Sequence, residues 1–226
     1  LKQLEEEGFS VTLLPVSETG MVTPEAVQAA IRPDTCLVSV MFANNEIGTI
    51  EPVCEIGEIA HKHGILFHTD AVQAMCHVPI NVTEMNIDLL SASAHKFHGP
   101  KGVGFMYMKN TAKLEPFIHG GAQERARRAG TSNVPGIVGM GQAVKLALGT
   151  LDKDTHTIIN MRNYIVDRIL GEIPDVTFDG PCIDANADVN AVSVGLPMCS
   201  LNRLPSNMHF CFKDVSGDSL LIMLDM

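Results

Sequence analysis

Three clusters of polar residues follow apolar, strand-like stretches of this sequence. The clusters are Asn44-Asn45-Glu46, Asp70 with Gln73, and Ser93-Ala94-His95-Lys96. In open α/β sheets the carboxyl ends of the strands border the ligand crevice. Three such clusters would therefore meet at one edge of a sheet, where an amine, a carboxylate, amides and hydroxyls could act on one ligand.

This set of groups matches what a pyridoxal 5′-phosphate (PLP) site requires. A lysine amine must attack the cofactor aldehyde and form a Schiff base, and a carboxylate must keep the pyridine nitrogen protonated. A neutral donor should face the ring oxygen, and hydroxyl or backbone N–H groups should hold the phosphate. Lys96, Asp70, Gln73 and Ser93 supply these parts within one run of the chain.

Each residue also has a simpler structural interpretation. Asp70 could be only the N-cap of the following turn, and Ser93 could cap a turn in the same way. His95 could be an interior histidine with satisfied hydrogen bonds, and Lys96 a solvated lysine. Only the order and spacing of the four residues together favour a cofactor site over these alternatives.

The elements that must position these residues alternate between helix and strand patterns through the first 110 residues, which predicts an α/β fold with a mostly parallel sheet. The run 36–42 is apolar and β-branched, so we expect a strand buried on both faces. The remaining expected strands are 9–15, 65–68, 87–92, 102–108, 176–178, 191–194 and 208–212. The expected helices are 1–7, one from Thr23, 52–63 with Gly64 as C-cap, 135–151, 155–171 and one from Gly217.

Composition narrows the class of protein. Apolar residues make up 46% and charged residues 19%, as in ordinary globular proteins. The net charge of −10 argues against nucleic acid or an anionic membrane as a partner, and no apolar run approaches the roughly 20 residues of a membrane span. The basic cluster 125–128 is the local exception, either a solvated face or an anion site between glycines.

The cysteines and the first residues bear on the compartment. The six cysteines include no C-x-x-C pair, so they fit neither a zinc site nor a disulfide framework, and we expect reduced thiols in a cytoplasmic protein. A mitochondrial location stays open if the protein is eukaryotic. The opening Leu1-Lys2-Gln3-Leu4 does not resemble a signal peptide and is typical of the middle of a longer chain.

Four ordered motifs resemble the class V aminotransferase superfamily, closest to the cysteine desulfurases of the nitrogen-fixation and housekeeping iron–sulfur type and the similar selenocysteine lyases. The resemblance runs from residue 1 to about 151 and resumes over 204–226. The motifs are Phe42-Ala43-Asn44-Asn45-Glu46-Ile47-Gly48, His68-Thr69-Asp70-Ala71-Val72-Gln73, Ser91-Ala92-Ser93-Ala94-His95-Lys96-Phe97-His98-Gly99-Pro100-Lys101-Gly102, and Gly120-Gly121-Ala122-Gln123-Glu124-Arg125 through Arg128-Ala129-Gly130-Thr131.

The resemblance implies a PLP-dependent fold of type I, in which a mostly parallel sheet carries helices on both faces beside a smaller α/β domain. Residues 1–152 would belong to the large PLP-binding domain, without its N-terminal part, and 153–226 to part of the small domain. It also implies the site roles. Lys96 would be the Schiff-base lysine, and Asp70 would be the partner of the pyridine nitrogen. Gln73 and Asn45 would donate to the ring oxygen, and Ser93 and His95 would bind the phosphate. Thr131 would bind the phosphate in the partner subunit of a homodimer.

The implied reaction removes sulfur from L-cysteine and gives alanine and an enzyme persulfide, for iron–sulfur cluster assembly or other sulfur transfer to an acceptor or scaffold protein. Selenocysteine lyase is the alternative enzyme, and a non-catalytic fragment is the alternative of another class. The family's catalytic cysteine and substrate-carboxylate arginine would lie beyond Met226, so we assign none of the six cysteines as catalytic. The stretch 184–203 is longer than is usual in the family and has no assigned role.

Overall fold

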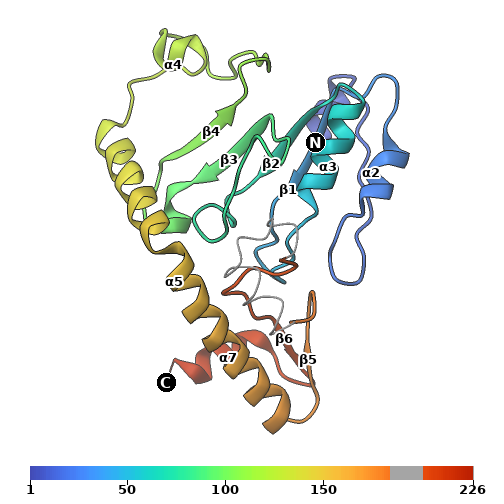
Figure 1. Ribbon diagram of the computed structural model, residues 1–226, viewed down its shortest axis with the longest axis vertical. Helices are drawn as coiled ribbons and strands as arrows, with labels where there is room; N and C mark the ends of the chain where they lie inside the picture. Colours follow the sequence, from blue (N-terminus) through green and yellow to red (C-terminus); the bar gives the residue numbers. More distant parts are fainter. Residues whose placement is uncertain (184–200, 226) are drawn as a thin grey trace.

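The computed structural model describes residues 1–183 and 201–225, and its centre is a four-stranded sheet with the order β1-β2-β3-β4 (Figure 1). The first three strands are parallel and β4 is antiparallel to β3. The sheet is therefore mixed but mostly parallel, as the alternating pattern predicted. The strands are β1 Leu37–Met41, β2 Leu66–Asp70, β3 Leu89–Ser93 and β4 Gly104–Met108.

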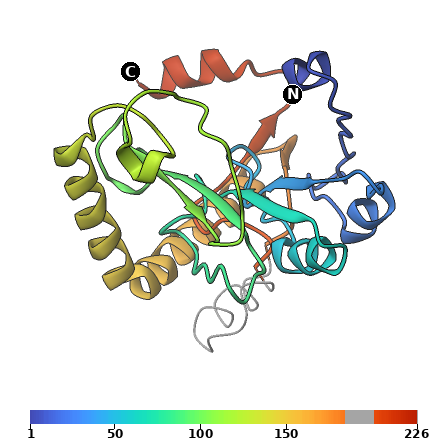
Figure 2. The same ribbon diagram turned by 90° about the horizontal axis from the view of Figure 1, so that it is seen from above.

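Helices flank this sheet in both views (Figures 1 and 2). On one side lie α3 (Val53–Lys62), which contacts β2, and α2 (Pro24–Ala30), which packs on α3. The Thr23 hydroxyl caps α2 by accepting a hydrogen bond from the Ala26 N–H. Gly64 follows α3 with a φ of +70°, as expected for a helix-ending glycine.

The other side of the sheet is flanked by α5, a continuous helix from Val134 to Glu172. The sequence predicted two helices, 135–151 and 155–171, so the break at 152–154 was wrong. Those three residues include no Gly or Pro, and nothing else in them interrupts the i→i−4 hydrogen bonds. The expected domain boundary at 152/153 lies inside this helix. The helix contacts η1 (Ala94–Phe97), in the expected large domain, and β5 (Val176–Phe178), in the expected small domain.

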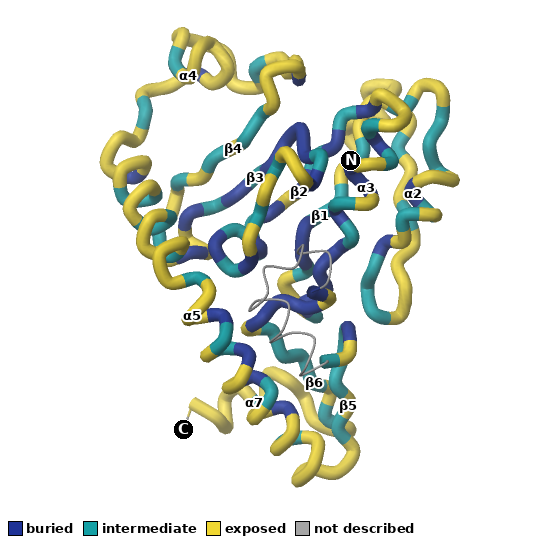
Figure 3. Tube along the Cα trace, viewed as in Figure 1, coloured by how far each residue is buried: buried dark blue, intermediate teal, exposed yellow. Residues whose placement is uncertain are grey.

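Helix α5 is also long and apolar enough, by length and composition alone, to cross a membrane, with a window of mean hydropathy 1.3 of which only 6% is buried. One such helix is weak evidence for a span. Much of α5 is exposed (yellow in Figure 3), and a helix covered by another protein surface has the same composition.

A second, two-stranded antiparallel sheet pairs β5 with β6 (Phe210–Phe212), and the helix α7 (Gly217–Leu224) follows it. Strand 176–178 was predicted with these bounds, the last helix with its start at Gly217, and β6 is the end of the expected strand 208–212. The expected strand 191–194, like most of the stretch 184–203, lies outside the described residues. Two short helices complete the described elements, α1 (Lys2–Glu6) and α4 (Gln123–Ala126).

Two further expectations were wrong. Residues 9–15 form no strand, because no neighbouring strand within the described residues accepts their backbone hydrogen bonds. Strand β1 is not buried on both faces, since Leu37 and Ser39 are exposed and the other three residues are half-buried. β1 is the edge strand of the sheet, and a cavity of about 650 Å³ lined by parts of 8–16, α2 and β1 lies against it.

The main core lies between the sheet and α3, where Phe42, Ile56, Phe67 and Ile87 are at most 1% exposed. A smaller cluster joins Cys76 and Phe97 to the N-terminal half of α5. These contacts fix β2, β3 and η1, which carry most of the residues predicted to bind a cofactor.

Candidate cofactor site

Asp70 is the last residue of β2 and lies in register with Met41 of β1 and Ser91 of β3. Its carbonyl accepts a hydrogen bond of 2.8 Å from the Phe42 N–H. One carboxylate oxygen, Oδ1, accepts the Val72 N–H at 2.9 Å, so the simpler interpretation of Asp70 as a turn cap holds. The residue is exposed, and the cap uses only one of its two oxygens. The carboxylate can therefore cap the turn and also face a ligand.

Lys96 lies in η1, one turn of 3-10 helix that begins directly after β3. The turn is fixed from two directions, because His77 Nε2 donates to the Lys96 carbonyl at 2.9 Å and the Gly99 N–H donates to the Ala94 carbonyl at 2.8 Å. A Cβ on Gly99 would come within 2.8 Å of Ala94 Cβ, so only glycine fits there. The lysine side chain is exposed, and within residues 1–183 and 201–225 no hydrogen bond or ion pair holds its Nζ. The backbone is anchored while the amine stays available.

Ser93 and His95 flank the start of this turn and share a hydrogen bond of 2.8 Å between Ser93 Oγ and His95 Nδ1. Ser93 is half-buried and His95 is exposed. The Ser93 hydroxyl makes no hydrogen bond to the backbone of η1. A hydroxyl and an imidazole placed this way can donate together to an anion.

Asn45 is exposed in the loop that follows β1, and residues distant in sequence hold this loop. Asn207 Nδ2 donates to the Glu46 carbonyl at 2.8 Å and lies 3.4 Å from the Asn45 carbonyl. Gly48, with a φ of +75°, lets the Asn207 side chain approach, because a Cβ there would lie 2.5 Å from Asn207 Oδ1. Nothing in the sequence pointed to this contact beyond the presence of Asn207 in the resembling stretch 204–226.

The two remaining predicted residues lie in different settings. Gln73 is half-buried in the turn after β2, three residues beyond Asp70. Thr131 is exposed in the segment between α4 and α5. The preceding α4 is unusual, since its residues Glu124, Arg125 and Ala126 all have positive φ angles. Arg128 is exposed, and its Nη1 donates to the Ala129 carbonyl at 3.0 Å.

His68 is a site residue that sequence reasoning missed. It lies two positions before Asp70 on β2, so both side chains leave the same face of the strand. Its Nδ1 is 2.8 Å from Ser39 Oγ and its Nε2 is 3.0 Å from Ser91 Oγ, which links all three parallel strands. Burial lowers the pKa of His68, although the Asp70 charge opposes that shift. The period-two spacing of His68 and Asp70 was the available signal.

The sheet edge therefore brings together Asn45, Asp70, Ser93, His95 and Lys96, and four of these five are exposed. The donor set fits PLP, because it offers a free amine, a carboxylate oxygen, an amide and a hydroxyl–imidazole pair. Two cavities lie beside β1 and between η1 and α5. The exposure of Asn45, Asp70, His95 and Lys96 makes this part of the site an open surface.

Comparisons with known proteins agree with this chemistry. The family model "Aminotransferase class-V" matches residues 1–204. The chain is 50% identical over 223 residues to a cysteine desulfurase IscS of Clostridium botulinum and 48% identical over 222 residues to one of Methanosarcina thermophila. These matches cover 99% and 98% of this chain but 52% and 50% of the relatives, so the chain spans about half their length.

Solved structures show the same likeness. A NifS-like protein superposes with a TM-score of 0.86 at 35% identity, over 99% of this chain and 56% of that one. A structure titled "SspA in complex with cysteine" superposes with a TM-score of 0.62 at 47% identity, over 64% of this chain and 42% of that one. The mixed sheet with flanking helices is thus the PLP-dependent fold of type I that the motifs predicted. The chain belongs to the class V aminotransferase family, and its similarity within that family is to the cysteine desulfurases.

Proposed function

We propose that this chain is the cofactor-holding part of a PLP-dependent cysteine desulfurase. The observation that carries the proposal is the free, exposed Lys96 amine on an anchored turn, at the same sheet edge as the Asp70 carboxylate. The names of the similar proteins, cysteine desulfurases, support the reaction that the resemblance implies, removal of sulfur from L-cysteine to give alanine and an enzyme persulfide.

Each predicted site residue has its own proposed role toward the cofactor. When bound, PLP supplies an electron sink next to the substrate Cα. Lys96 Nζ would hold the cofactor through its aldehyde carbon and, once displaced by the substrate amine, move a proton from Cα. Asp70 would hold a proton on the pyridine nitrogen, and Asn45 and Gln73 would donate to the ring oxygen. Ser93 and His95 would bind the phosphate.

His68 would act as a positioning residue in this arrangement. The neutral imidazole, held between Ser39 and Ser91, lies on the same strand face as Asp70. Because the His68 imidazole is neutral, it forms no ion pair with Asp70. The Asp70 carboxylate is then available to the ligand. The low pKa of His68 supports this neutral state.

Covalent labelling tests the role of Lys96. The chain is incubated with PLP, reduced with borohydride, digested, and the pyridoxyl-labelled peptide is identified by mass spectrometry. We expect the label on Lys96 in the parent chain and in Lys101→Ala, a control that removes an exposed neighbouring lysine, and loss of the label in Lys96→Ala. Equal labelling of other lysines, unchanged in Lys96→Ala, would refute the proposal.

L-cysteine is the proposed substrate and selenocysteine the less favoured one, since the similar curated proteins are named cysteine desulfurases and one similar structure contains cysteine. A complete protein that contains this chain should form alanine from L-cysteine. Turnover of selenocysteine without turnover of cysteine would favour the lyase instead, and no turnover of either would favour a non-catalytic role.

The proposal extends to a homodimer in which Thr131 reaches the partner's phosphate. Thr131 is exposed, and exposed apolar residues that precede and follow it in the sequence suit a protein partner. Those residues are Phe117, Ile118, Val134, Ile137, Val138, Leu146 and Leu148. A sulfur-acceptor or scaffold protein, with iron–sulfur cluster assembly as the destination of the sulfur, completes the proposed partners. Cys36, Cys54, Cys76, Cys182 and Cys211 form no disulfide within the part of the chain that the structure describes, which supports the proposal of a reducing, cytoplasmic setting.

A further inference from the structure

The two-stranded sheet of β5 and β6 has one aromatic face and one polar face. Phe178 pairs directly with Phe210, and their ring centroids are 5.3 Å apart. Phe212 lies on the same face as Phe210, with centroids 6.1 Å apart. Because side chains alternate along a strand, the intervening residues must leave the opposite face. His209 and Cys211 are those residues.

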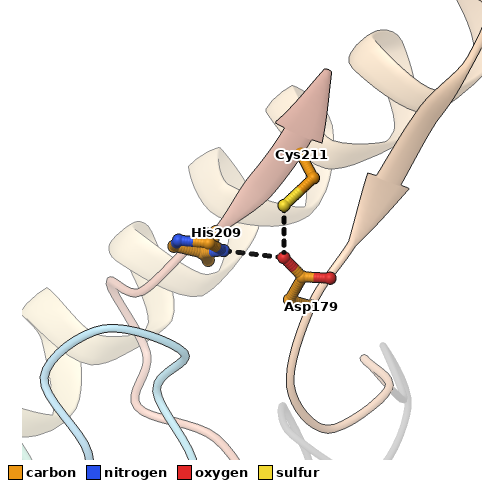
Figure 4. A group of neighbouring side chains, drawn as sticks. All are labelled: Asp179, His209 and Cys211. Atoms are coloured by element: carbon orange, nitrogen blue, oxygen red, sulfur yellow. Dashed lines mark hydrogen bonds and ion pairs between the residues drawn. The ribbon is translucent and has the colours of Figure 1, made fainter. Parts of the chain in front are cut away.

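Asp179 extends β5 by one residue and joins this polar face. Its N–H donates to the His209 carbonyl at 3.0 Å, which places it opposite His209 in the antiparallel pair. Figure 4 shows the three side chains of Asp179, His209 and Cys211 converging from the two neighbouring strands. Asp179 Oδ2 lies 2.8 Å from His209 Nδ1 and 3.0 Å from Cys211 Sγ. One carboxylate oxygen thus takes hydrogen bonds from an imidazole and a thiol.

A carboxylate, an imidazole and a thiol are the side chains that bind Zn²⁺ in proteins. Their three ligand atoms lie within 4.8 Å of one another. A tetrahedral ion with metal–ligand distances of about 2.0–2.3 Å would separate the nitrogen and oxygen by about 3.3 Å and the sulfur and oxygen by about 3.5 Å. Each present contact therefore needs to open by only about 0.5 Å, within the range of side-chain rotation.

We propose that Asp179, His209 and Cys211 form a binding site for Zn²⁺ or a similar borderline-soft divalent cation, with the fourth position open to water or an external ligand. None of the three residues belongs to the proposed PLP site, so the inference does not depend on that function. Binding would replace the Cys211 thiol proton, which is released, and would use His209 as a neutral ligand with its proton on Nε2.

The surroundings allow such an ion to enter and give it a structural role. The side chains of His209 and Asp179 are 42% and 36% exposed, and Cys211 is exposed. Arg203 is a positive group beside the cluster, since it donates to the Asp179 carbonyl and lies over the Phe178 ring, 4.2 Å from its centroid. β5 and β6 pair over only three residues each, and a two-stranded sheet is marginal by itself. A metal bridging both strands would hold them together.

Zinc titration by calorimetry and cobalt absorption spectroscopy on the reduced 226-residue chain, without added PLP, test the site. We expect one Zn²⁺ bound with a Kd of about 1 µM or tighter, and a thiolate charge-transfer band with Co²⁺. Cys211→Ser should abolish the band, and both Cys211→Ser and His209→Gln should weaken Zn²⁺ binding at least about 100-fold, beyond the range known for outer-shell partners.

Cys36→Ser is the matched control, since Cys36 is also a free, exposed cysteine and lies outside the cluster. Circular dichroism shows whether each variant keeps its fold, and His209→Gln tests the site independently if Cys211→Ser does not fold. The proposal is overturned if the parent chain binds no stoichiometric Zn²⁺ at 100-fold above the expected Kd of about 1 µM. It is equally overturned if the thiolate band survives Cys211→Ser or disappears in Cys36→Ser.

Discussion

Asp88 offers the sharpest test of how the sheet that carries the proposed cofactor residues is held together. The residue is 3% exposed and lies at the end of the sheet opposite to Asp70 and Lys96, directly before β3. Its Oδ2 accepts the Phe67 N–H at 3.0 Å and contacts His61 Nε2 at 2.8 Å, and its Oδ1 lies 3.2 Å from Lys109 Nζ. One buried carboxylate thus joins β2, α3 and the end of β4.

The cost of Asp88→Ala follows from what each partner loses. The Phe67 N–H would be buried without an acceptor, which costs about 1–3 kcal/mol. His61 and Lys109 are partly exposed and regain water, so each adds at most about 1 kcal/mol. We expect a loss of about 2–4 kcal/mol in the free energy of unfolding. Since 1 kcal/mol shifts the Tm of a chain of this size by about 2–4 °C, the Tm should fall by about 4–16 °C.

Asp88→Asn separates the charge from the hydrogen bond, because an amide oxygen can still accept the Phe67 N–H. We expect a smaller loss, about 1–2 kcal/mol. Asp34→Ala is the control for an exposed carboxylate, whose ion pair with Arg32 should contribute at most about 0.5 kcal/mol. Thermal unfolding followed by circular dichroism measures all three variants. Equal effects of Asp88→Ala and Asp34→Ala would refute the reasoning.

The pH dependence gives a second measurement on the same residue. Burial raises the pKa of Asp88, but hydrogen bonds from Phe67, His61 and Lys109 outweigh it and hold the pKa below its ordinary value. A carboxyl whose pKa is lower in the folded state stabilises the fold above its ordinary pKa of about 3.9, and this contribution is lost as the pH falls through the folded value. The stability difference between the parent chain and Asp88→Asn should therefore be full at pH 6 and shrink towards pH 3. A difference that grows on acidification would contradict the assigned hydrogen bonds.

Three further predictions concern the site and the helices. In a complete enzyme, Asp70→Asn keeps the turn cap but removes the charge. It should lower turnover by several factors of ten, each about 1.4 kcal/mol, and leave the Tm unchanged. Activity within threefold of the parent would mean that Asp70 is only a turn cap. Thr131→Val should weaken PLP retention and dimer formation together, and an effect on neither by absorbance and sedimentation would exclude the shared site. Gly57→Ala should destabilise the fold by about 1–3 kcal/mol, because its Cβ would lie 2.5 Å from the Met85 carbonyl oxygen. Gly149 has open space around it, so Gly149→Ala should stabilise α5 by up to about 1 kcal/mol. Thermal unfolding measures both variants.

Local patterns were sufficient for most of the fold. The apolar β-branched runs located β2, β3 and β4, and Gly64 marked the end of α3. The errors arose where structure depends on distant neighbours. The apolar run 36–42 predicted a strand but not that β1 would be the edge of the sheet. The sequence also predicted two helices, 135–151 and 155–171, although residues 152–154 are each compatible with a helix and α5 continues through them.

For the candidate site, too, local patterns were sufficient and contacts between distant residues were missed. Asp70, Gln73, Ser93, His95 and Lys96 lie within 27 consecutive residues, so their order in the sequence was enough to propose a cofactor site. His68 and Asn207 were missed because their partners are distant in sequence: His68 contacts Ser39 and Ser91 across two strand pairs, and Asn207 reaches the loop that holds Asn45. No period within one segment reveals such contacts.

These long-range contacts also connect the two sheets of the molecule. Arg203, 1% exposed, donates from one guanidinium to the Asp179 carbonyl at the end of β5 and, at 3.0 Å, to Asn207 Oδ1. Asn207 in turn donates to the Glu46 carbonyl, beside Asn45. The loop that presents Asn45 is therefore held by the 201–207 segment as well as by β1. Removing a partner from a buried charged group costs more than removing a surface contact. The position of Asn45 therefore depends on a buried arginine more than 150 residues away along the chain. The two-stranded sheet that leads into Asp179 thus forms part of the support of the proposed cofactor site.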